Sequence, residues 1–328
     1  MPPLSEKFPW SCLPIGSDVY SRAMSHIVQE RSIRGNILDG AALSKTIIEE
    51  IKGKLDRIRA SGKPAPGLAV ILAGDNPASA AYVGAKQRAC EKAGFFSLLE
   101  RLPETVAESE LLGLIARLNS DPKIHGILVQ LPLPAKIDSA RVMQAIDPLK
   151  DVDGFHPVNV GKLTLGEDGL APCTAVGCIE ILKRYNIPIK GKKALVLGRS
   201  NIVGKPTSML LLKENATVTM AHSQTLNLAD EVRSADILVA AIGKPEFVKG
   251  NWIKESAVVI DVGISSVPNP AKPGHNRLVG DVEFLLARER AGWITPVPGG
   301  VGPMTIAMLL QNTLKAWNQI VAKNESPQ

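Results

Sequence analysis

Short apolar strands alternate with helical segments along most of the chain, and this alternation constrains the fold more than any other feature. Apolar residues recur at helical spacing from Leu43 to Ile58, and Leu68–Ala73 follows as an uninterrupted apolar run. Strands that are apolar on both faces are typical of parallel sheets covered by helices on either side. The first half continues with an expected helix at 77–94, strand at 98–102, helix at 111–118, strand at 126–130 and helix at 141–146.

The second half repeats the pattern after a connection at residues 153–171. Its expected strands are Lys193–Leu197, Ala216–Met220, Asp236–Ile242 and Ala257–Val262. Pro303 fits the first turn of a final helix. Since 328 residues are many for one core, we expect an α/β protein of two domains, the second doubly wound and Rossmann-like, with a cleft between them. The expected division is an extension at 1–34, a first domain at 35–172 plus 303–328, and a second domain at 173–302.

A glycine loop joins a strand to the start of a helix in the second domain. The strand Lys193–Leu197 runs directly into the segment Gly198–Gly204. In this setting the backbone N–H groups at the start of a helix can hold phosphate. The spacing differs from GxGxxG, because Ser200 replaces the second glycine and the last glycine comes one place late. An ordinary turn between a strand and a helix therefore remains an alternative.

The segment beyond the next strand indicates which dinucleotide this loop binds. NAD-binding folds place an acidic residue roughly 20 residues after the glycines, yet residues 215–228 contain none. Ser223 and Arg199 offer a hydroxyl and a guanidinium instead, which suit a 2′-phosphate that a carboxylate would repel. We therefore expect NADP as the cofactor.

Tyr82 and Lys86 are the first candidates for chemistry. Their spacing of four residues places a phenol beside an ammonium on one face of the expected helix, where the pair can tune proton transfer. A plain amphipathic helix with an extended lysine is the alternative. The same YxxxK pattern occurs in short-chain dehydrogenases, where it follows the glycine loop. Here it precedes the loop by more than a hundred residues, which argues against that class.

Three further segments carry candidate ligand-binding groups. Gln130 ends an apolar strand, and ligands of open α/β sheets lie at the carboxyl ends of strands. Asp151 and Asp153 place two carboxylates in one loop, and Pro296–Pro303 is a glycine- and proline-rich loop whose backbone can approach a ligand closely. Capping and turn formation are the alternatives for these segments.

Composition excludes several other classes of protein. The four cysteines form no CxxC pair, and the five histidines form no HExxH pair, so we expect no metal site and no disulfide framework. The net charge of +6 is mild for this length, and no basic cluster is interleaved with aromatic residues, so we expect no nucleic-acid partner. No apolar run approaches the roughly 20 residues that span a bilayer, so we expect no membrane association.

Five segments together closely resemble the bifunctional methylenetetrahydrofolate dehydrogenase/cyclohydrolase family. They are Tyr82–Lys86, Val129–Pro132, Asp151–Gly154, Gly198–Pro206 and Pro296–Thr305, and the resemblance extends over about residues 35–320. It implies oxidation of 5,10-methylenetetrahydrofolate by NADP⁺ to the methenyl cation, followed by hydrolysis to 10-formyltetrahydrofolate. A monofunctional NADP-dependent dehydrogenase and a non-catalytic folate- or NADPH-binding module remain alternatives.

The resemblance also implies roles for individual residues. Lys86 would be the main catalytic group, Tyr82 would stack on the folate and bond Lys86, Gln130 would orient Lys86, and Asp153 would hold the pterin. The remaining expected substrate-binding residues are Leu131, Pro298 and Gly299. The expected cofactor-binding residues are Thr174, Gly198, Arg199, Ser200, Val203, Gly204, Ser223 and Ile264. The family is usually dimeric through its cofactor domain, so a homodimer is expected.

Two features depart from the family pattern. Ala175 stands where the family often has proline, beside Thr174. The N-terminal segment 1–34 lies outside the resemblance and lacks the apolar core of a signal peptide. Its acidic residues argue against a standard mitochondrial presequence, so we expect a cytoplasmic enzyme and keep a mitochondrial location as the alternative.

Overall fold

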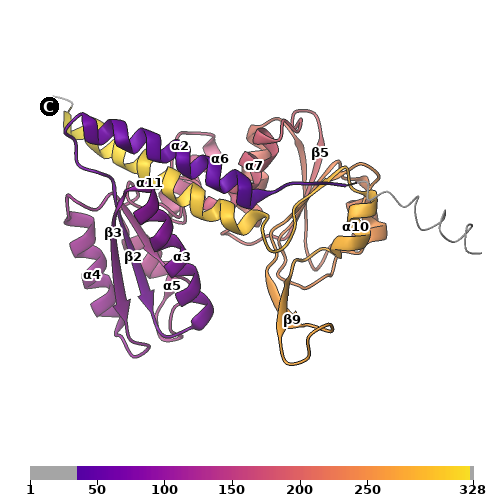
Figure 1. The fold of residues 1–328 in the computed structure, drawn as a ribbon, viewed down its shortest axis with the longest axis horizontal. Coiled ribbons are helices and arrows are strands. Elements are labelled where there is room, and N and C mark those ends of the chain that lie inside the picture. The colour runs from indigo at the N-terminus through magenta and orange to yellow at the C-terminus, as the bar shows by residue number, and fades with distance from the viewer. Residues whose placement is uncertain (1–34, 326–328) are drawn as a thin grey trace, which may run out of the picture.

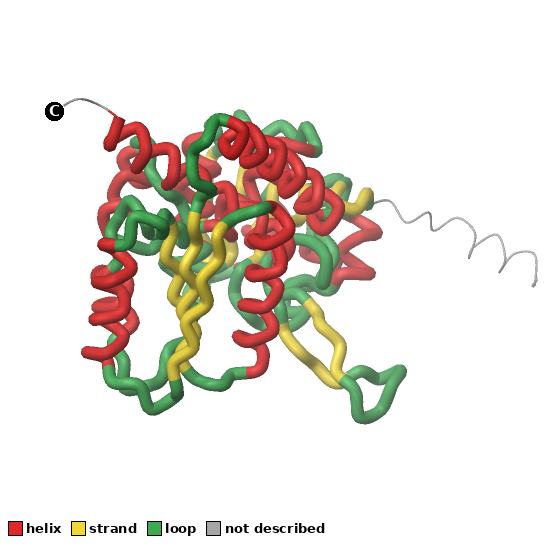
Figure 2. Tube along the Cα trace, turned by 60° about the vertical axis from the view of Figure 1, so that its left-hand side comes forward, coloured by secondary structure: helices red, strands yellow, loops and turns green. Residues whose placement is uncertain are grey.

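The computed structural model describes residues 35–325, which form two α/β units side by side (Figure 1). The first unit is built on three parallel strands in the order β3-β2-β4. These strands are β2 (Gly67–Ala73), β3 (Phe96–Leu102) and β4 (Gly126–Val129). Helices α3 (Pro77–Ala93), α4 (Glu108–Ser120) and α5 (Ser139–Ala145) accompany them, and Figure 2 shows helices on both sides of the sheet.

Strand β2 explains why this sheet reads as a continuous apolar run in the sequence. Leu68 and Val70 join one buried cluster, whereas Ala69 and Ile71 join a second cluster on the other face. Since successive side chains of a strand point to opposite faces, both faces must be apolar. The predicted parallel sheet of the first unit is thus confirmed.

The second unit contains a six-stranded parallel sheet in the order β1-β11-β8-β7-β5-β6. The strands are β1 (Asn36–Ile37), β5 (Lys193–Leu197), β6 (Thr217–Ala221), β7 (Ile237–Ala240), β8 (Val258–Asp261) and β11 (Trp293–Ile294). The flanking helices are α7 (Cys173–Arg184), α8 (Gly204–Lys213), α9 (Leu228–Ser234), α10 (Phe284–Arg290) and the 3-10 turn η1 (Gly250–Trp252). A hairpin of β9 (Ser265–Pro268) and β10 (Asn276–Val279) projects from this unit (Figure 1). The predicted two-domain α/β architecture with a Rossmann-like second domain is confirmed.

Two long helices connect the units. Helix α11 (Val301–Glu325) runs beside α2 (Gly40–Ala60) along one side of the molecule (Figure 1), and it also packs on α7. Pro303 lies in the first turn of α11, as the sequence predicts. Helix α6 (Pro157–Leu165) precedes the connection to α7.

The first described strand departs from the expected division. Residues 35–172 were assigned to the first domain, yet Asn36 and Ile37 pair with Trp293 and Ile294 at the edge of the second sheet. The described part of the chain therefore begins in the second unit and crosses to the first through α2. A strand of two residues carries no periodicity, which is why its sequence does not reveal its partner.

Candidate functional site

Lys86 and Gln130 meet at the carboxyl end of the small sheet. Lys86 is only 4 % exposed, and its Nζ donates to Oε1 of Gln130 at 3.0 Å. The amide Nε2 of Gln130 donates to the backbone oxygen of Leu131 at 2.7 Å. Only one amide orientation serves both partners, because the ammonium is a donor and the carbonyl is an acceptor. Gln130 thus fixes the direction of the lysine nitrogen without cancelling its charge.

Tyr82 lies beneath the same nitrogen. The Nζ of Lys86 is 4.5 Å from the centre of the Tyr82 ring, a cation–π contact. The bond expected between phenol and ammonium therefore takes the form of a contact with the ring face, while the Tyr82 hydroxyl shares a hydrogen bond with Thr305. The Thr305 hydroxyl in turn lies 3.2 Å from that of Thr174. Burial raises the pKa of Tyr82 above its usual value, so this phenol stays protonated near neutral pH.

The loop after β4 is held by one aspartate and presents another. Asp151 is 1 % exposed, and its carboxylate accepts hydrogen bonds from the backbone N–H groups of Phe155 (3.2 Å) and His156 (2.8 Å) and from the side chain of Asn159 (2.9 Å). Asp153 is half-buried beside Cys173, which also donates from its thiol to the Val152 carbonyl at 3.2 Å. Asp151 therefore shapes the loop, and Asp153 is the carboxylate available to a ligand.

Burial governs the charge states of this site. Burial lowers the pKa of Lys86, and the negative charge of Asp153 works in the opposite direction. Burial raises the pKa of Asp153 to about 6, against the effect of the Lys86 charge. Each group therefore stabilises the charged form of the other, and the lysine is closer to neutrality than a lysine in water.

The loop at 296–300 anchors the second unit to the first. The amide of Ala41, at the start of α2, donates to the oxygen of Gly299 at 2.8 Å. A side chain at Gly40 would lie 1.9 Å from the oxygen of Gly300, so the two backbones touch directly. Pro298 is exposed at the tip of this loop, and Gly299 adopts a φ of 108°.

A second hollow lies at the carboxyl ends of the strands in the larger sheet. It has a volume of about 420 Å³ and lies beside the glycine loop. Its lining residues are Leu197, Gly198, Arg199, Ser200, His222, Ser223, Leu228, Ala241, Ile242, Lys244 and Phe247. Among these described lining residues two are cations and none is acidic, which fits a cofactor with an additional phosphate.

The glycine loop has the geometry of a phosphate turn. Gly198 adopts a φ of 125°, and a side chain there would lie 2.2 Å from the oxygen of Ala241. A side chain at Gly204 would lie 2.2 Å from the oxygen of Gly198. Ser200 accepts from the amides of Val203 and Gly204, each at 3.2 Å, so its side chain closes the turn. The helix that starts at Gly204 directs its amino end to this turn, and the residues present fit a dinucleotide phosphate.

Some expected residues lie outside this second hollow. Val203 and Gly204 lie behind the turn at the start of α8. Ile264 is 59 % exposed and faces Gly302 at the start of α11, and Thr174 faces Thr305. Their placement corresponds to the region between the units rather than to the hollow beside Arg199.

The structure adds site residues that sequence reasoning did not name. Thr305 contacts Tyr82, Cys173 contacts Asp153, and Asn312 donates to the backbone oxygens of Val152 and Ala171, each at 2.9 Å. Thr305 and Asn312 are seven residues apart and so lie on one face of α11. The available signal was a pair of polar residues at this spacing within the mostly apolar first half of the helix.

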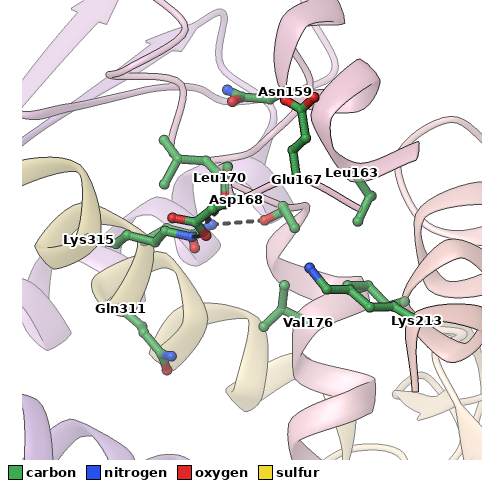
Figure 3. Close-up of a pocket in the computed structure, with 13 residues that line it drawn as sticks. Asn159, Leu163, Glu167, Asp168, Leu170, Val176, Lys213, Gln311 and Lys315 are labelled. Atoms are coloured by element: carbon green, nitrogen blue, oxygen red, sulfur yellow. Dashed lines mark hydrogen bonds and ion pairs between the residues drawn. The ribbon is translucent and has the colours of Figure 1, made fainter. Parts of the chain in front are cut away.

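Two other hollows border the connection between the units. One of about 440 Å³ is lined by residues of α6 and of the start of α8, together with Phe155 and Ile202. The other, of about 250 Å³, lies at the loop between α6 and α7 (Figure 3). There Lys315 of α11 pairs with Asp168, and Lys213 of α8 donates to the oxygen of Gly166 at 3.2 Å. These contacts tie the connecting loop to α11 and to α8.

The described residues hold neither a metal-binding cluster nor a membrane-spanning helix. No cluster of three or more histidine, cysteine or acidic side chains there is arranged to hold a metal ion. Across residues 35–325, no helix is both long and apolar enough to cross a membrane.

Comparisons with known proteins agree with this geometry. Residues 38–153 match the tetrahydrofolate dehydrogenase/cyclohydrolase catalytic domain, and residues 172–321 match the NAD(P)-binding domain of the same family. The chain is 57 % identical over 280 residues to the bifunctional protein FolD of Moorella thermoacetica, covering 85 % of this chain and 98 % of the relative.

Solved structures give the same result. The bifunctional FolD enzyme of Campylobacter jejuni is similar with a TM-score of 0.83 and 46 % identity, over 87 % of this chain and 99 % of that one. The Trypanosoma brucei FolD complexed with NADP cofactor and an inhibitor has a TM-score of 0.84 and 43 % identity, over 88 % and 98 %. This chain belongs to the tetrahydrofolate dehydrogenase/cyclohydrolase family.

Proposed function

We propose that this protein oxidises 5,10-methylenetetrahydrofolate to 5,10-methenyltetrahydrofolate with NADP⁺ and hydrolyses the product to 10-formyltetrahydrofolate. The observation that carries the proposal is the buried Lys86, whose nitrogen is aimed by Gln130 and Tyr82. A hydride transfer needs mainly positioning of its two reactants. A hydrolysis needs a proton acceptor and a proton donor as well, and a lysine with a lowered pKa can serve as both.

The cofactor site follows from the glycine turn. Gly198, Ser200, Val203 and Gly204 would hold the pyrophosphate, and Arg199 and Ser223 would bind the 2′-phosphate. Thr174 and Ile264 would border the nicotinamide end, because both lie near the start of α11. NADP⁺, when bound, accepts the hydride of the first reaction.

The folate site occupies the opposite side of the reaction centre. Asp153 would accept hydrogen bonds from the N–H groups of the pterin edge. Tyr82 would stack on the substrate, and Leu131, Pro298 and Gly299 would border it. Gln130 keeps the Lys86 nitrogen directed at the one-carbon bridge.

In the hydrolysis, Lys86 first accepts a proton from water and then donates a proton to the ring nitrogen. Its neutral amine takes a proton as water adds to the methenyl carbon. Its ammonium returns a proton to the ring nitrogen as the ring opens. Burial lowers the pKa of Lys86, which favours the neutral amine that the first proton transfer needs. The negative charge of Asp153 raises this pKa and so favours the ammonium that the second transfer needs.

A two-stage spectrophotometric assay tests the proposal. The purified protein is given methylenetetrahydrofolate with NADP⁺ and then with NAD⁺, and separately methenyltetrahydrofolate without a nucleotide. We expect NADPH formation, weaker use of NAD⁺, and loss of the methenyl absorbance in the nucleotide-free assay. Oxidation with no accelerated loss of methenyl absorbance would support the monofunctional dehydrogenase instead.

The second unit also offers a surface for self-association, and a homodimer is part of the proposal. Leu278 is 46 % exposed, Leu285 78 % and Leu286 47 %, and all three border a hollow of about 450 Å³ at the base of the hairpin. Exposed apolar residues that gather in one place are typical of interaction sites.

Domain limits and location complete the proposal. The folate domain would comprise residues 35–172 plus 303–328 except for strand β1, and the cofactor domain residues 173–302. We place the enzyme in the cytoplasm, where thiols such as the free Cys90, Cys173 and Cys178 stay reduced. Cell fractionation distinguishes this location from the mitochondrial matrix.

A further inference from the structure

A buried aspartate far from the substrate residues holds one wall of the cofactor hollow. Asp281 follows β10 and is 0 % exposed. Its carboxylate accepts the backbone N–H groups of Ile242 at 2.7 Å, Gly243 at 3.0 Å and Lys244 at 2.8 Å. Three consecutive amides therefore wrap around a single side chain.

These amides begin where the strand ladder ends. The amide of Ala241 still donates to the oxygen of Leu197 at 2.8 Å, and that of Val262 donates to Ala240 at 2.9 Å. Beyond Ala241 no strand of the described residues supplies an acceptor, and these partly buried N–H groups need another partner. Asp281 supplies it, so the wall keeps a fixed shape after leaving the sheet.

The same segment touches the phosphate turn. Ile242 and Lys244 line the same hollow as Arg199 and Ser223. A Cβ atom added at Gly198 would lie only 2.2 Å from the backbone oxygen of Ala241, so the wall and the turn are in close contact. A shift of the wall would therefore displace both the lining side chains and the turn that holds phosphate.

Asp281 is itself rigidly placed. Its amide donates to Oδ1 of Asp261 at 2.9 Å, and its oxygen accepts from the amide of Val248 at 2.9 Å. Side chains at Gly263 or Gly280 would enter the space of these carboxylates, at 2.3 Å from Asp281 and 1.9 Å from Asp261. The carboxylate is thus built into the fold, with no exposed surface for a ligand or for water.

We propose that Asp281 is a positioning residue for NADP binding, which presets the wall Ala241–Lys244 through its three amide hydrogen bonds. The inference rests on the proposed function, because it takes the hollow beside Arg199 as the cofactor site. Asp281 does not touch the cofactor or the reacting atoms. It acts through the backbone of residues 241–244, which borders the cofactor hollow.

The test is the substitution Asp281→Asn, measured by NADPH titration and by nucleotide-free hydrolysis of methenyltetrahydrofolate. An amide of the same size offers one acceptor oxygen, so at least one of the three N–H groups loses its partner. We expect the Kd for NADPH to rise about tenfold. The hydrolysis rate should stay within about twofold of wild type, since it needs only the folate side of the site.

Glu283→Gln is the matched control. Glu283 lies two residues further along, and its carboxylate accepts from Gly250 at 3.1 Å rather than from the wall. NADPH affinity should be unchanged in this variant. If Asp281→Asn bound NADPH as tightly as wild type, or lost hydrolysis in parallel with NADPH affinity, the positioning role would be refuted. Failure of the wild-type protein to bind NADPH would instead refute the proposed function.

Discussion

The charges of Lys86 and Asp153 stabilise one another in a site where burial disfavours the charged form of each. Burial raises the pKa of Asp153 to about 6 even with the lysine nearby. A protonated Asp153 has lost an acceptor for the pterin N–H groups. The affinity for folate should therefore be highest above about pH 6 and fall as the pH drops through that value.

Calorimetric titration with 5-formyltetrahydrofolate, a folate that lacks the one-carbon bridge between N5 and N10, measures this pH dependence. Wild-type affinity should decline about tenfold for each pH unit well below the pKa of Asp153. Asp153→Asn should bind weakly with little dependence on pH over the same range. An unchanged pH profile in the variant would show that another group controls binding.

We propose that cofactor choice rests on Arg199 and Ser223, which line the second hollow. Arg199→Ala should raise the KM for NADP⁺ by about 10- to 150-fold, since losing a charge-assisted hydrogen bond costs roughly 1.5–3 kcal/mol. The KM for NAD⁺ should change little. Lys205→Ala is the control, because Lys205 is exposed nearby and donates to Asn201 at 2.7 Å without lining the hollow. Equal losses with NADP⁺ and NAD⁺ would contradict the assignment of Arg199.

The loop between β4 and α6 is an element in which two aspartates have separate tasks. Asp151 is buried with three hydrogen-bond donors around it, whereas Asp153 is half-buried and free to meet a ligand. Removal of Asp151 leaves buried donors unpaired, at about 1–3 kcal/mol each. Removal of Asp153 takes away a carboxylate whose charged form burial disfavours, so it should mainly affect the binding of folate.

We therefore expect Asp151→Ala to lower the free energy of unfolding by about 2–4 kcal/mol, while Asp153→Ala changes it little. Asp153→Ala should reduce both the dehydrogenase and the cyclohydrolase activity and leave the Kd for NADPH unchanged. Thermal unfolding, the two activity assays and an NADPH titration supply the readouts. Loss of only one activity in Asp153→Ala would place this residue in chemistry rather than in substrate positioning.

At the scale of the whole molecule, periodicity predicted the layers and most of the strands. Lys193–Leu197 was predicted with its observed limits, because an apolar run ends sharply at Gly198. The strand expected at Asp236–Ile242 is shorter in the structure, Ile237–Ala240, because the amide of Ile242 leaves the ladder for Asp281. Such a long-range acceptor leaves no local pattern in the sequence.

The sequence likewise predicted some features of the candidate site and not others. Lys86, Tyr82 and Gln130 were predicted together, and they lie in contact. Helix α7 was not predicted, although Cys178, Ile181 and Leu182 fall at helical spacing on its buried face. The contact between Thr305 and Tyr82 leaves no such local pattern, because the two residues are far apart along the chain. Turn chemistry alone did not indicate that Asp151 is buried and fully hydrogen-bonded whereas Asp153 is only half-buried.

The proposed homodimer is also a property of the whole molecule. Leu285→Lys should convert a dimer to a monomer at micromolar concentration, since it places a charge within the apolar patch of Leu278, Leu285 and Leu286. Leu165→Lys is the matched control, because Leu165 is 74 % exposed on α6, outside the patch. Sedimentation velocity distinguishes the two states. A monomeric wild-type protein, or equal dissociation in both variants, would count against this interface.

The central claim is that Lys86 carries the proton transfers of hydrolysis, and Lys86→Met tests it most directly. The substitution keeps an unbranched side chain against Tyr82 while removing the nitrogen that Gln130 holds. The measurement is the methenyltetrahydrofolate absorbance during turnover with NADP⁺, on a variant whose fold is verified by thermal unfolding. The account predicts measurable NADPH formation, accumulation of methenyltetrahydrofolate, and no catalysed hydrolysis. Hydrolysis at a rate near that of wild type would contradict the account.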